Sequence, residues 1–196
     1  MGKVVVSQFI TMDGVVEDPG GSEGFARGGW AFTFNRGEEG DRFKLEEVMA
    51  GGALLLGRVT YEGFAAAWPS RTGAFADKYN GMPKYVVSTT LKDPAWHNTT
   101  VIAGDVAQAV AQLKREVAGD ILVNGSVRLV QTLAAHGLVD EYRLMVFPTV
   151  LGAGKRLFGE TSAPAAFRLT DARRAGETMV LIFVSDREGA AESTSA

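Results

Sequence analysis

The stretch Leu54–Glu62 (LLLGRVTYE) places an apolar run immediately before Gly57, Arg58 and Thr60. A short continuous apolar run is typical of a strand buried on both faces of a parallel sheet, and the residues that follow can begin a helix. A strand that ends in Gly-Arg-x-Thr at a helix start offers backbone N–H groups, a guanidinium and a hydroxyl to a phosphate. The alternative is a plain turn, in which Arg58 is a solvated surface charge and Thr60 only caps the helix.

A second junction of the same kind lies at Ile121–Ser126 (ILVNGS). Gly125 permits a positive φ, Asn124 tolerates one better than most residues, and Ser126 can cap the helix that follows. Alone, this junction is explained equally well by an ordinary strand-to-helix turn. In open α/β folds, however, cofactors bind at the carboxyl ends of parallel strands. Two such junctions at one edge of a sheet therefore predict that the chain holds the two ends of a dinucleotide.

The rest of the chain predicts strands that alternate with helices, followed by strands alone. Apolar and β-branched runs predict strands at 3–10, 53–56, 84–88, 99–103, 121–123, 141–147, 167–174 and 178–185, and helical patterns lie at 41–50, 60–67, 74–79, 106–117 and 127–135. This order predicts an α/β fold with an about eight-stranded, mainly parallel mixed sheet that ends in a C-terminal antiparallel hairpin. We expect a single domain over residues 1–185 and a disordered C-terminal tail over 186–196.

The composition excludes several classes of function. With 20 Lys and Arg against 23 Asp and Glu, the chain has a net charge of −3, which argues against a nucleic-acid partner. Because there is no cysteine, disulfides, thiolate zinc sites and cysteine nucleophiles are excluded. His97 and His136 have no metal-ligand partner at helical spacing, so no metal site is predicted. No apolar stretch reaches about 18 residues and the N-terminus does not resemble a signal peptide, which predicts a cytoplasmic protein without membrane contact.

Three further features can each be interpreted in two ways. Ser88 and Thr89 end the expected third strand, and they could contact a ribose or its phosphate or simply lead into a turn. Asp41 lies near a helix start, where it could bind the amidine edge of a pterin or pyrimidine, or could cap the helix. The long loop over 11–40 carries aromatic residues between 25 and 34, which would either line a substrate pocket or form a local mini-core.

The chain lacks the G-x-G-x-x-G and Walker motifs, but its motifs match another nucleotide-binding family. These motifs are Met12-Asp13-Gly14, Leu55–Glu62, Gly137–Tyr142 and Pro148–Phe158. Over residues 3–185 the chain resembles the dihydrofolate reductase superfamily, and within it the C-terminal reductase domain of the bifunctional riboflavin-biosynthesis deaminase–reductase. Asn124 departs from this pattern, because it stands where the family has the first glycine of a pair.

The resemblance implies a dihydrofolate reductase-like three-layer sandwich and an NADPH-dependent reductase of a small heterocyclic substrate. The activity would be most like that of 5-amino-6-(5-phosphoribosylamino)uracil reductase of riboflavin biosynthesis. As the catalytic residue, Asp41 would orient or protonate a pyrimidine or pterin-like substrate. The residues that would bind NADPH are Gly57, Arg58, Val59 and Thr60 on one phosphate side, Asn124, Gly125, Ser126 and Val127 on the pyrophosphate and nicotinamide side, and Ser88 and Thr89 near the 2′-phosphate.

The sequence leaves two other functions open. One is a dihydrofolate or pterin reductase, which turnover of dihydrofolate would favour. The other is a non-catalytic NADPH-binding protein with a degenerate substrate site, which would bind the cofactor but reduce no pterin, pyrimidine or ribose compound. The resemblance also implies a homodimer, for which the apolar strand Leu144–Phe147 offers an interface, although the same strand could be core.

Overall fold

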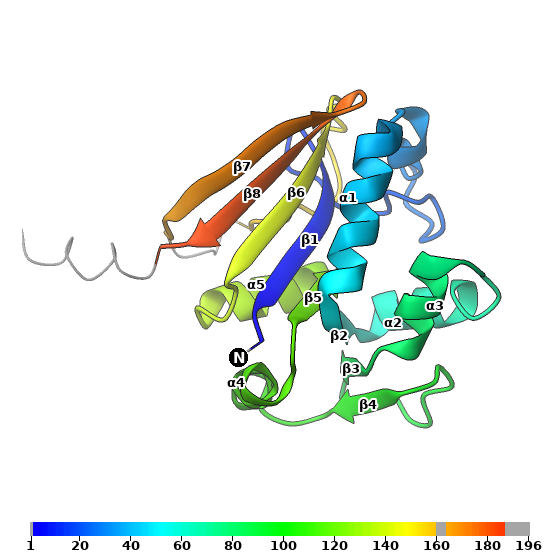
Figure 1. Ribbon diagram of the computed structural model, residues 1–196, viewed down its shortest axis with the longest axis vertical. Coiled ribbons are helices and arrows are strands. Elements are labelled where there is room, and N and C mark those ends of the chain that lie inside the picture. Colours follow the sequence, from blue (N-terminus) through cyan, green and yellow to red (C-terminus); the bar gives the residue numbers. More distant parts are fainter. Residues whose placement is uncertain (1, 160–163, 187–196) are drawn as a thin grey trace, which may run out of the picture.

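The computed structural model describes residues 2–159 and 164–186, which form one mixed sheet with helices on both faces (Figure 1). The strands are β1 (Val4–Thr11), β2 (Gly51–Gly57), β3 (Lys84–Val87), β4 (Thr99–Ile102), β5 (Asp120–Asn124), β6 (Glu141–Phe147), β7 (Phe167–Ala175) and β8 (Thr178–Ser185). The helices are η1, a 3-10 turn (Trp30–Thr33), α1 (Gly37–Ala50), α2 (Arg58–Ala67), α3 (Ala74–Gly81), α4 (Val106–Glu116) and α5 (Val127–Ala135). The tail expected to be disordered lies, apart from Asp186, outside the described residues.

The predicted sheet is confirmed. Its eight strands are ordered β4-β3-β2-β5-β1-β6-β8-β7, and the six strands from β4 to β6 are parallel. The last two strands form the predicted hairpin, because the short turn around Gly176 can only join antiparallel neighbours. None of the helices within the described residues has the length and apolar character that crossing a membrane requires.

Alternating side chains divide the core into two layers, one on each face of the sheet. Val4 and Val6 of β1 face α4 and α5, whereas Val5 faces the other side, together with Leu54 and Leu56 of β2. Helices α1, α2 and α3 cover that second face. This arrangement is the expected three-layer sandwich, and it leaves the carboxyl ends of the parallel strands at one rim.

The boundary that matters most for the site is the one between β2 and α2. The sequence pattern placed the helix start at residue 60, but α2 begins at Arg58, directly after the last strand residue, Gly57. Arg58 therefore occupies the first turn of a helix at the sheet rim, rather than a loop. Similarly, α1 begins at Gly37, four residues before the predicted start at residue 41.

The long loop after β1 folds into a local mini-core. The Trp30 ring packs edge-on against Phe147 with ring centroids 5.3 Å apart, and its indole N–H donates to the carbonyl of Glu17. Asp18 orders the part of the loop that precedes Trp30, because its carboxylate accepts hydrogen bonds from backbone N–H groups there, including that of Phe25. Since Trp30 is buried whereas Phe32 is 76% exposed, the mini-core interpretation of the loop aromatics holds for Trp30.

Asp13 joins the loop after β1 to the glycine-rich loop after β6. Its carboxylate accepts a hydrogen bond from Thr11 Oγ1 at 2.7 Å and another from the Gly152 backbone N–H at 2.8 Å. The Thr11 hydrogen bond, opposed by burial and supported by the backbone N–H groups, lowers the pKa of Asp13 from 3.8 to about 2. The ionised side chain therefore stabilises the folded protein.

Asp13→Asn should remove a pH-dependent part of the stability. Because the folded-state pKa lies below the unfolded value, the contribution is present above pH 3.8 and is lost as the pH falls toward 2. We expect the free energy of unfolding of the wild type to fall between these values by on the order of 1 kcal/mol more than that of the variant, since the carboxylate is partly screened by solvent. Urea titrations at several pH values measure this difference.

Asp93→Asn is the matched control, because Asp93 is an exposed aspartate whose positive φ asparagine also tolerates. Its pH profile should follow the wild type. Identical profiles for all three proteins would show that Asp13 does not stabilise the two loops.

Candidate functional site

The two strand-to-helix junctions meet at the rim of the sheet. The Gly57 N–H donates to Ser126 Oγ at 2.9 Å, and the Ser126 N–H donates to Thr60 Oγ1 at 3.0 Å. Each junction therefore supplies one donor and one acceptor to the other. These bonds bring the β2–α2 and β5–α5 turns, which are 66 to 69 residues apart in the chain, into direct contact.

The second junction adopts a backbone that few residues tolerate. Gly125 has a φ of 58° and Ser126 a φ of 52°, so two consecutive residues lie in the left-handed region. A Cβ on Gly125 would lie 3.0 Å from Thr60 Cγ2, so the backbone there can approach Thr60 only because the residue is glycine. Gln8 of β1 fixes the same turn by donating from Nε2 to the Gly125 carbonyl at 2.7 Å. Such strained turns are held in place by their surroundings and cluster at ligand sites.

Two helix N-termini converge here without side-chain caps. The N-cap residues of α2 and α5 are Gly57 and Ser126, and neither makes a side-chain hydrogen bond to its own helix within the described residues. The first-turn N–H groups of both helices and their positive dipole ends are therefore available to an anion. Two such ends side by side suit a diphosphate, which carries charge on both of its phosphates. The residues present thus fit the dinucleotide that the sequence predicts.

Arg58 and Val59 lie at the exposed edge of this rim. Arg58 Nη1 donates to both carboxylate oxygens of Glu62 at 2.9 Å, and its side chain remains 44% exposed. A cation in the first turn of a helix opposes the helix dipole, so Glu62 offsets an arrangement that is otherwise unfavourable. Val59 is 62% exposed, so its side chain is accessible to a ligand at this rim.

Ser88 and Thr89 follow β3 next to the first junction, since Val87 pairs with Gly57 in the sheet register. Ser88 Oγ accepts hydrogen bonds from the N–H groups of Thr90 and Leu91, at 3.1 and 2.9 Å, so this hydroxyl closes the turn. Thr89 is exposed. The structure therefore places Thr89, rather than Ser88, with a free approach to a ligand at this rim.

Asp41 lies apart from the hydrogen bonds that join the junctions. It is the fifth residue of α1, its side chain is 66% exposed, and Oδ1 accepts from Arg36 Nε at 2.5 Å. The N-cap of α1 is Arg36, so the interpretation of Asp41 as a helix cap is wrong. Its catalytic role stays a prediction.

A buried polar cluster that the sequence did not reveal lies beside the second junction. We define the Ser7 cluster as Ser7, Lys44, Glu47, Tyr79, Asn124 and Arg143. Ser7 Oγ donates to Glu47 Oε2 at 2.9 Å, and Lys44 Nζ donates to Ser7 Oγ at 2.6 Å and also to Glu47 Oε2. Asn124 Nδ2 donates to the Ser7 carbonyl at 3.3 Å, which links the cluster to the β5–α5 turn.

The charges of the Ser7 cluster are incompletely paired. Glu47 is buried, with its side chain 1% exposed, yet Oε1 accepts no hydrogen bond from the described residues and lies 3.9 Å from Arg143 Nη1. Burial alone would lower the pKa of Arg143, but its hydrogen bond to Glu141 and the charges of Glu141, Glu47 and Asp120 raise it.

Tyr79 closes the cluster on the α3 side. Burial, together with the charge of Glu47, raises the pKa of the Tyr79 hydroxyl above its ordinary value of 10.0. The hydroxyl therefore stays protonated and donates a hydrogen bond to Asn124 Oδ1 at 2.8 Å. Because Asn124 is held from both sides, its side chain has a fixed orientation at the end of β5.

One signal in the sequence could have revealed this cluster. Glu47 follows Phe43 by four positions in α1, so a helix that buries Phe43 also turns Glu47 toward the sheet. Lys44 is three positions from Glu47, at a spacing that allows an ion pair. The partner residues Ser7 and Arg143 lie on strands far away in the chain, and no local pattern indicates them.

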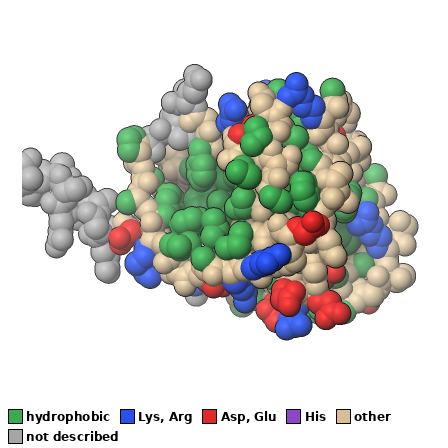
Figure 2. Space-filling model, turned by 90° about the horizontal axis from the view of Figure 1, so that it is seen from above, with side chains coloured by type: hydrophobic (Ala, Val, Ile, Leu, Met, Phe, Trp, Pro, Cys, Tyr) green, Lys and Arg blue, Asp and Glu red, His purple; other side chains and the backbone are tan. Residues whose placement is uncertain are grey.

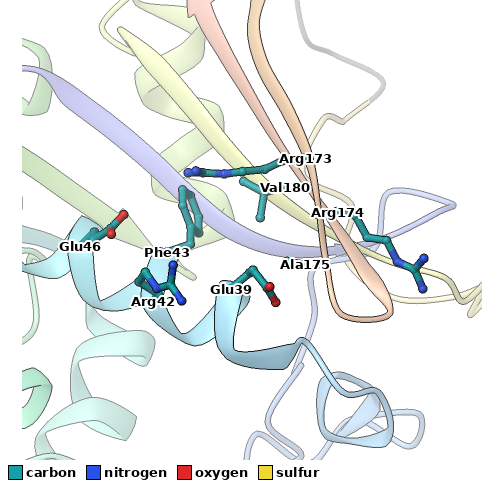
Figure 3. A pocket seen from close by; sticks show the side chains of 8 residues that line it. All are labelled: Glu39, Arg42, Phe43, Glu46, Arg173, Arg174, Ala175 and Val180. Atoms are coloured by element: carbon teal, nitrogen blue, oxygen red, sulfur yellow. The ribbon is translucent and has the colours of Figure 1, made fainter.

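A separate groove of about 140 Å³ lies between α1 and the β7–β8 hairpin (Figure 3). The Arg173 guanidinium lies over the Phe43 ring, 5.2 Å from its centroid. The lining residues are Glu39, Arg42, Phe43, Glu46, Arg173, Arg174, Ala175 and Val180. None of the predicted site residues is among them, so this groove is distinct from the rim.

Comparison with known proteins shows which family shares this arrangement. A family model of the RibD C-terminal domain matches residues 2–181. The Bacillus subtilis (strain 168) protein YwjB is 26% identical over 182 residues, which are 93% of this chain and 97% of YwjB. YyaP of the same organism is 28% identical over 134 residues, 66% of this chain and 71% of its own. Both proteins are described as uncharacterized.

Solved structures share the fold at low sequence identity. A candidate riboflavin biosynthesis protein from Shewanella sp. PV-4 has a TM-score of 0.72 at 21% identity, over 95% of this chain and 100% of that one. RibD from Acinetobacter baumannii has a TM-score of 0.63 at 14% identity, and the Thermotoga maritima deaminase/5-amino-6-(5-phosphoribosylamino)uracil reductase one of 0.61 at 12%. The match covers 95% and 94% of this chain, but only 59% and 56% of those two longer proteins.

Gly125→Ala should destabilise the protein through the second junction. Alanine in the left-handed region costs about 1–2 kcal/mol, and its Cβ would also press on Thr60. We therefore expect the free energy of unfolding to fall by at least about 1–2 kcal/mol, measured by urea denaturation.

Gly63→Ala in α2 is the matched control, because a Cβ at Gly63 meets no neighbouring atom within 4 Å. This variant should gain roughly 0.5–1 kcal/mol, since alanine is the better helix former. If Gly125→Ala were as stable as the wild type, or gained stability as Gly63→Ala should, the close approach at Gly125 would not be a constraint.

Proposed function

Because this chain belongs to the RibD C-terminal domain family, a family of reductases, we propose that it reduces a small heterocyclic substrate with NADPH. The activity we propose is most like the reduction of 5-amino-6-(5-phosphoribosylamino)uracil. The observation that carries this proposal is the pair of uncapped helix N-termini, α2 and α5, held together at the rim by the Gly57–Ser126 and Ser126–Thr60 hydrogen bonds.

Each predicted residue has a role in this proposal. Gly57, Arg58, Val59 and Thr60 hold one phosphate side, Asn124, Gly125, Ser126 and Val127 hold the pyrophosphate and nicotinamide side, and Ser88 and Thr89 lie by the 2′-phosphate. The first-turn N–H groups of α2 and α5 would donate to phosphate oxygens, and Arg58 would add charge. When bound, NADPH supplies the hydride, while the chain orients the two reactants and excludes water.

The alternatives are separated by what the protein turns over. A dihydrofolate or pterin reductase would reduce dihydrofolate and be inhibited by antifolates. A non-catalytic NADPH-binding protein would bind the cofactor and reduce nothing. Asp41, 66% exposed and paired with Arg36, is the proposed catalytic residue under the first two readings. Its exposure keeps the third alternative open.

The test begins with the cofactor. NADPH and NADH are titrated separately into the protein and followed by the fluorescence of Trp30, Trp68 and Trp96. We expect saturable binding of NADPH, followed by oxidation of NADPH with a pyrimidine, pterin or ribosylamine compound from a panel. Absence of binding by either nicotinamide would contradict the proposal.

Arg58→Ala should weaken NADPH binding. Loss of a charged hydrogen bond to phosphate costs about 1.5–3 kcal/mol, so the dissociation constant should rise roughly 10- to 100-fold. The same titration with NADH identifies the phosphate involved, because a contact to the 2′-phosphate leaves NADH binding almost unchanged.

Arg115→Ala serves as the control, since Arg115 lies in the last turn of α4 and takes no part in the rim. Its NADPH affinity should equal that of the wild type. If Arg58→Ala bound NADPH as tightly as the wild type, Arg58 would be a surface charge that does not contact the cofactor.

We also propose the homodimer that the family resemblance implies, but through another face than the one expected. Met145 and Phe147 of the apolar strand are buried in the core, so that strand is not an interface by itself. Met179 on the neighbouring strand β8 and Leu169 on the outer strand β7 are 40% and 50% exposed. Figure 2 shows hydrophobic side chains gathered in a hollow on the left of the molecule, the side on which β6, β7 and β8 lie in Figure 1.

Met179→Glu should convert a dimer into a monomer, because burying an unpaired carboxylate in an apolar interface is costly. Sedimentation velocity of the wild type and the variant measures the change. Phe32→Glu, at a 76% exposed apolar residue of η1, is the control and should leave the mass unchanged. A monomeric wild type would contradict the proposed dimer.

A further inference from the structure

We propose that Lys44 is the proton donor of the reduction and that Glu47 and Ser7 position it. This inference rests on the proposed function and adds a catalytic residue to it. Lys44 lies on α1, with Nζ bonded to Ser7 Oγ at 2.6 Å and to Glu47 Oε2. These contacts hold the ammonium over the middle of β1, rather than in solvent.

The first argument is the position of Lys44 relative to the rim. Ser7 pairs with Asn124 in the register of β1 and β5, and Asn124 Nδ2 donates to the Ser7 carbonyl at 3.3 Å. Asn124 is followed by Gly125, the residue with the closest backbone approach at the second junction. Neighbouring strands lie about 4.8 Å apart, so Lys44 stands one strand away from the proposed nicotinamide side.

The second argument is the gradient of exposure within the Ser7 cluster. The Glu47 side chain is 1% exposed and the Lys44 side chain 12% exposed. Burying a carboxylate costs several kcal/mol unless it is well paired, and of the two Glu47 oxygens only Oε2 accepts hydrogen bonds from the described residues. Both of the described donors to Oε2 are members of the Ser7 cluster, and the more exposed of the two is Lys44. A proton donor needs this arrangement, with a fixed ammonium and one open side.

The third argument concerns the charges around Lys44. On α1 this is Glu47, and at the N-cap of α1 it is Arg36; the Arg36 guanidinium and the Lys44 ammonium each lie 5.6 Å from the centroid of the Phe9 ring on β1. On β6, Arg143 bonds to Glu141 and Asp120 at 2.6 and 2.9 Å. Arg143 lies 3.9 Å from Glu47 Oε1, whereas Lys44 contacts Oε2, so the two cations share the buried carboxylate through different oxygens.

Asp41 differs from Lys44 in its surroundings. Its carboxylate is 66% exposed and is paired with Arg36, outside the Ser7 cluster. Lys44 offers N–H donors from a side chain that is only 12% exposed. In this proposal Asp41 therefore orients the substrate, and Lys44 donates the proton.

The chemistry balances without any further reactant. Hydride from the reduced nicotinamide forms a C–H bond at the carbon of a C=N or C=O group, and NADPH becomes NADP⁺. The π electrons of that group move to its nitrogen or oxygen, which takes a proton from the Lys44 ammonium. The neutral amine that remains is held by Ser7 and Glu47 and regains a proton from water at its exposed side.

A set of variants separates charge from proton donation. Lys44→Met removes both, whereas Lys44→Arg keeps the cation but cannot release a proton in the working range of pH. Glu47→Gln, or Ser7→Ala if that variant does not fold, removes the positioning contacts. Lys78→Met is the matched control, because Lys78 is a half-buried lysine like Lys44 but lies on α3, outside the Ser7 cluster.

Two measurements are made on each protein. The emission maximum of bound NADPH reports on a cation beside the nicotinamide and requires no substrate. It should shift in Lys44→Met and stay unchanged in Lys44→Arg and Lys78→Met. The second measurement is turnover of the compound that the wild type reduces. The kcat should fall about 10²–10⁴-fold in both Lys44 variants, with a smaller fall at unchanged KM in Glu47→Gln.

The outcomes distinguish this inference from the proposed function. If NADPH binds but Lys44→Met retains the wild-type emission or the wild-type kcat, Lys44 is not the donor, and the reductase assignment stands. Full activity in Lys44→Arg would likewise overturn proton donation. If the wild type binds no NADPH, or oxidises it with no compound of the panel, the proposed function and the role of Lys44 are both overturned.

Discussion

The reciprocal hydrogen bonds between the two strand-to-helix junctions are the constraint on which the site depends. Gly57 N–H to Ser126 Oγ and Ser126 N–H to Thr60 Oγ1 use the donors and acceptors of the turns themselves, so the first-turn N–H groups of α2 and α5 remain available. The same bonds explain why Gly125 must be glycine, because Thr60 stands where a side chain would be. The proposed phosphate-binding rim is thus built without a glycine-rich dinucleotide motif.

Behind this rim the protein keeps charge where an apolar core would be simpler. Helix α1 contacts the sheet through Phe43 and Val48, but also through Lys44 and Glu47, which bind Ser7. Replacing such a group by hydrophobic residues is often neutral or stabilising in other proteins, so stability alone does not explain a buried charge here, and the catalytic role proposed for Lys44 offers a reason. The turn at Ser126 is likewise an energetically unfavourable feature, because the surrounding hydrogen bonds hold a left-handed conformation that serine does not favour.

Much of the fold was predictable because its signals are local. Strands β6 and β8 have the predicted bounds, Glu141–Phe147 and Thr178–Ser185, since apolar runs bounded by turn residues define them. The early start of α1 was missed, because its first turn carries glycine and glutamate instead of an apolar stripe. The meeting of the two junctions followed from the rule for parallel strands. The Ser7 cluster did not, because its hydrogen bonds other than the one between Lys44 and Glu47 join residues 37 to 117 positions apart, and the roles assigned to the site residues stay predictions.

The outermost strand has a consequence for how the molecule behaves at high concentration. Strand β7 is nine residues long and, among the described strands, pairs only with β8, so in that part of the chain its other side is an edge to which a strand of another molecule could add. Arg168, Asp171, Arg173 and Arg174 line this strand, and its register shifts between Leu169 and Asp171. Charged side chains and an irregular backbone both discourage edge-to-edge aggregation. The long hairpin can therefore end the sheet without becoming a template for fibres.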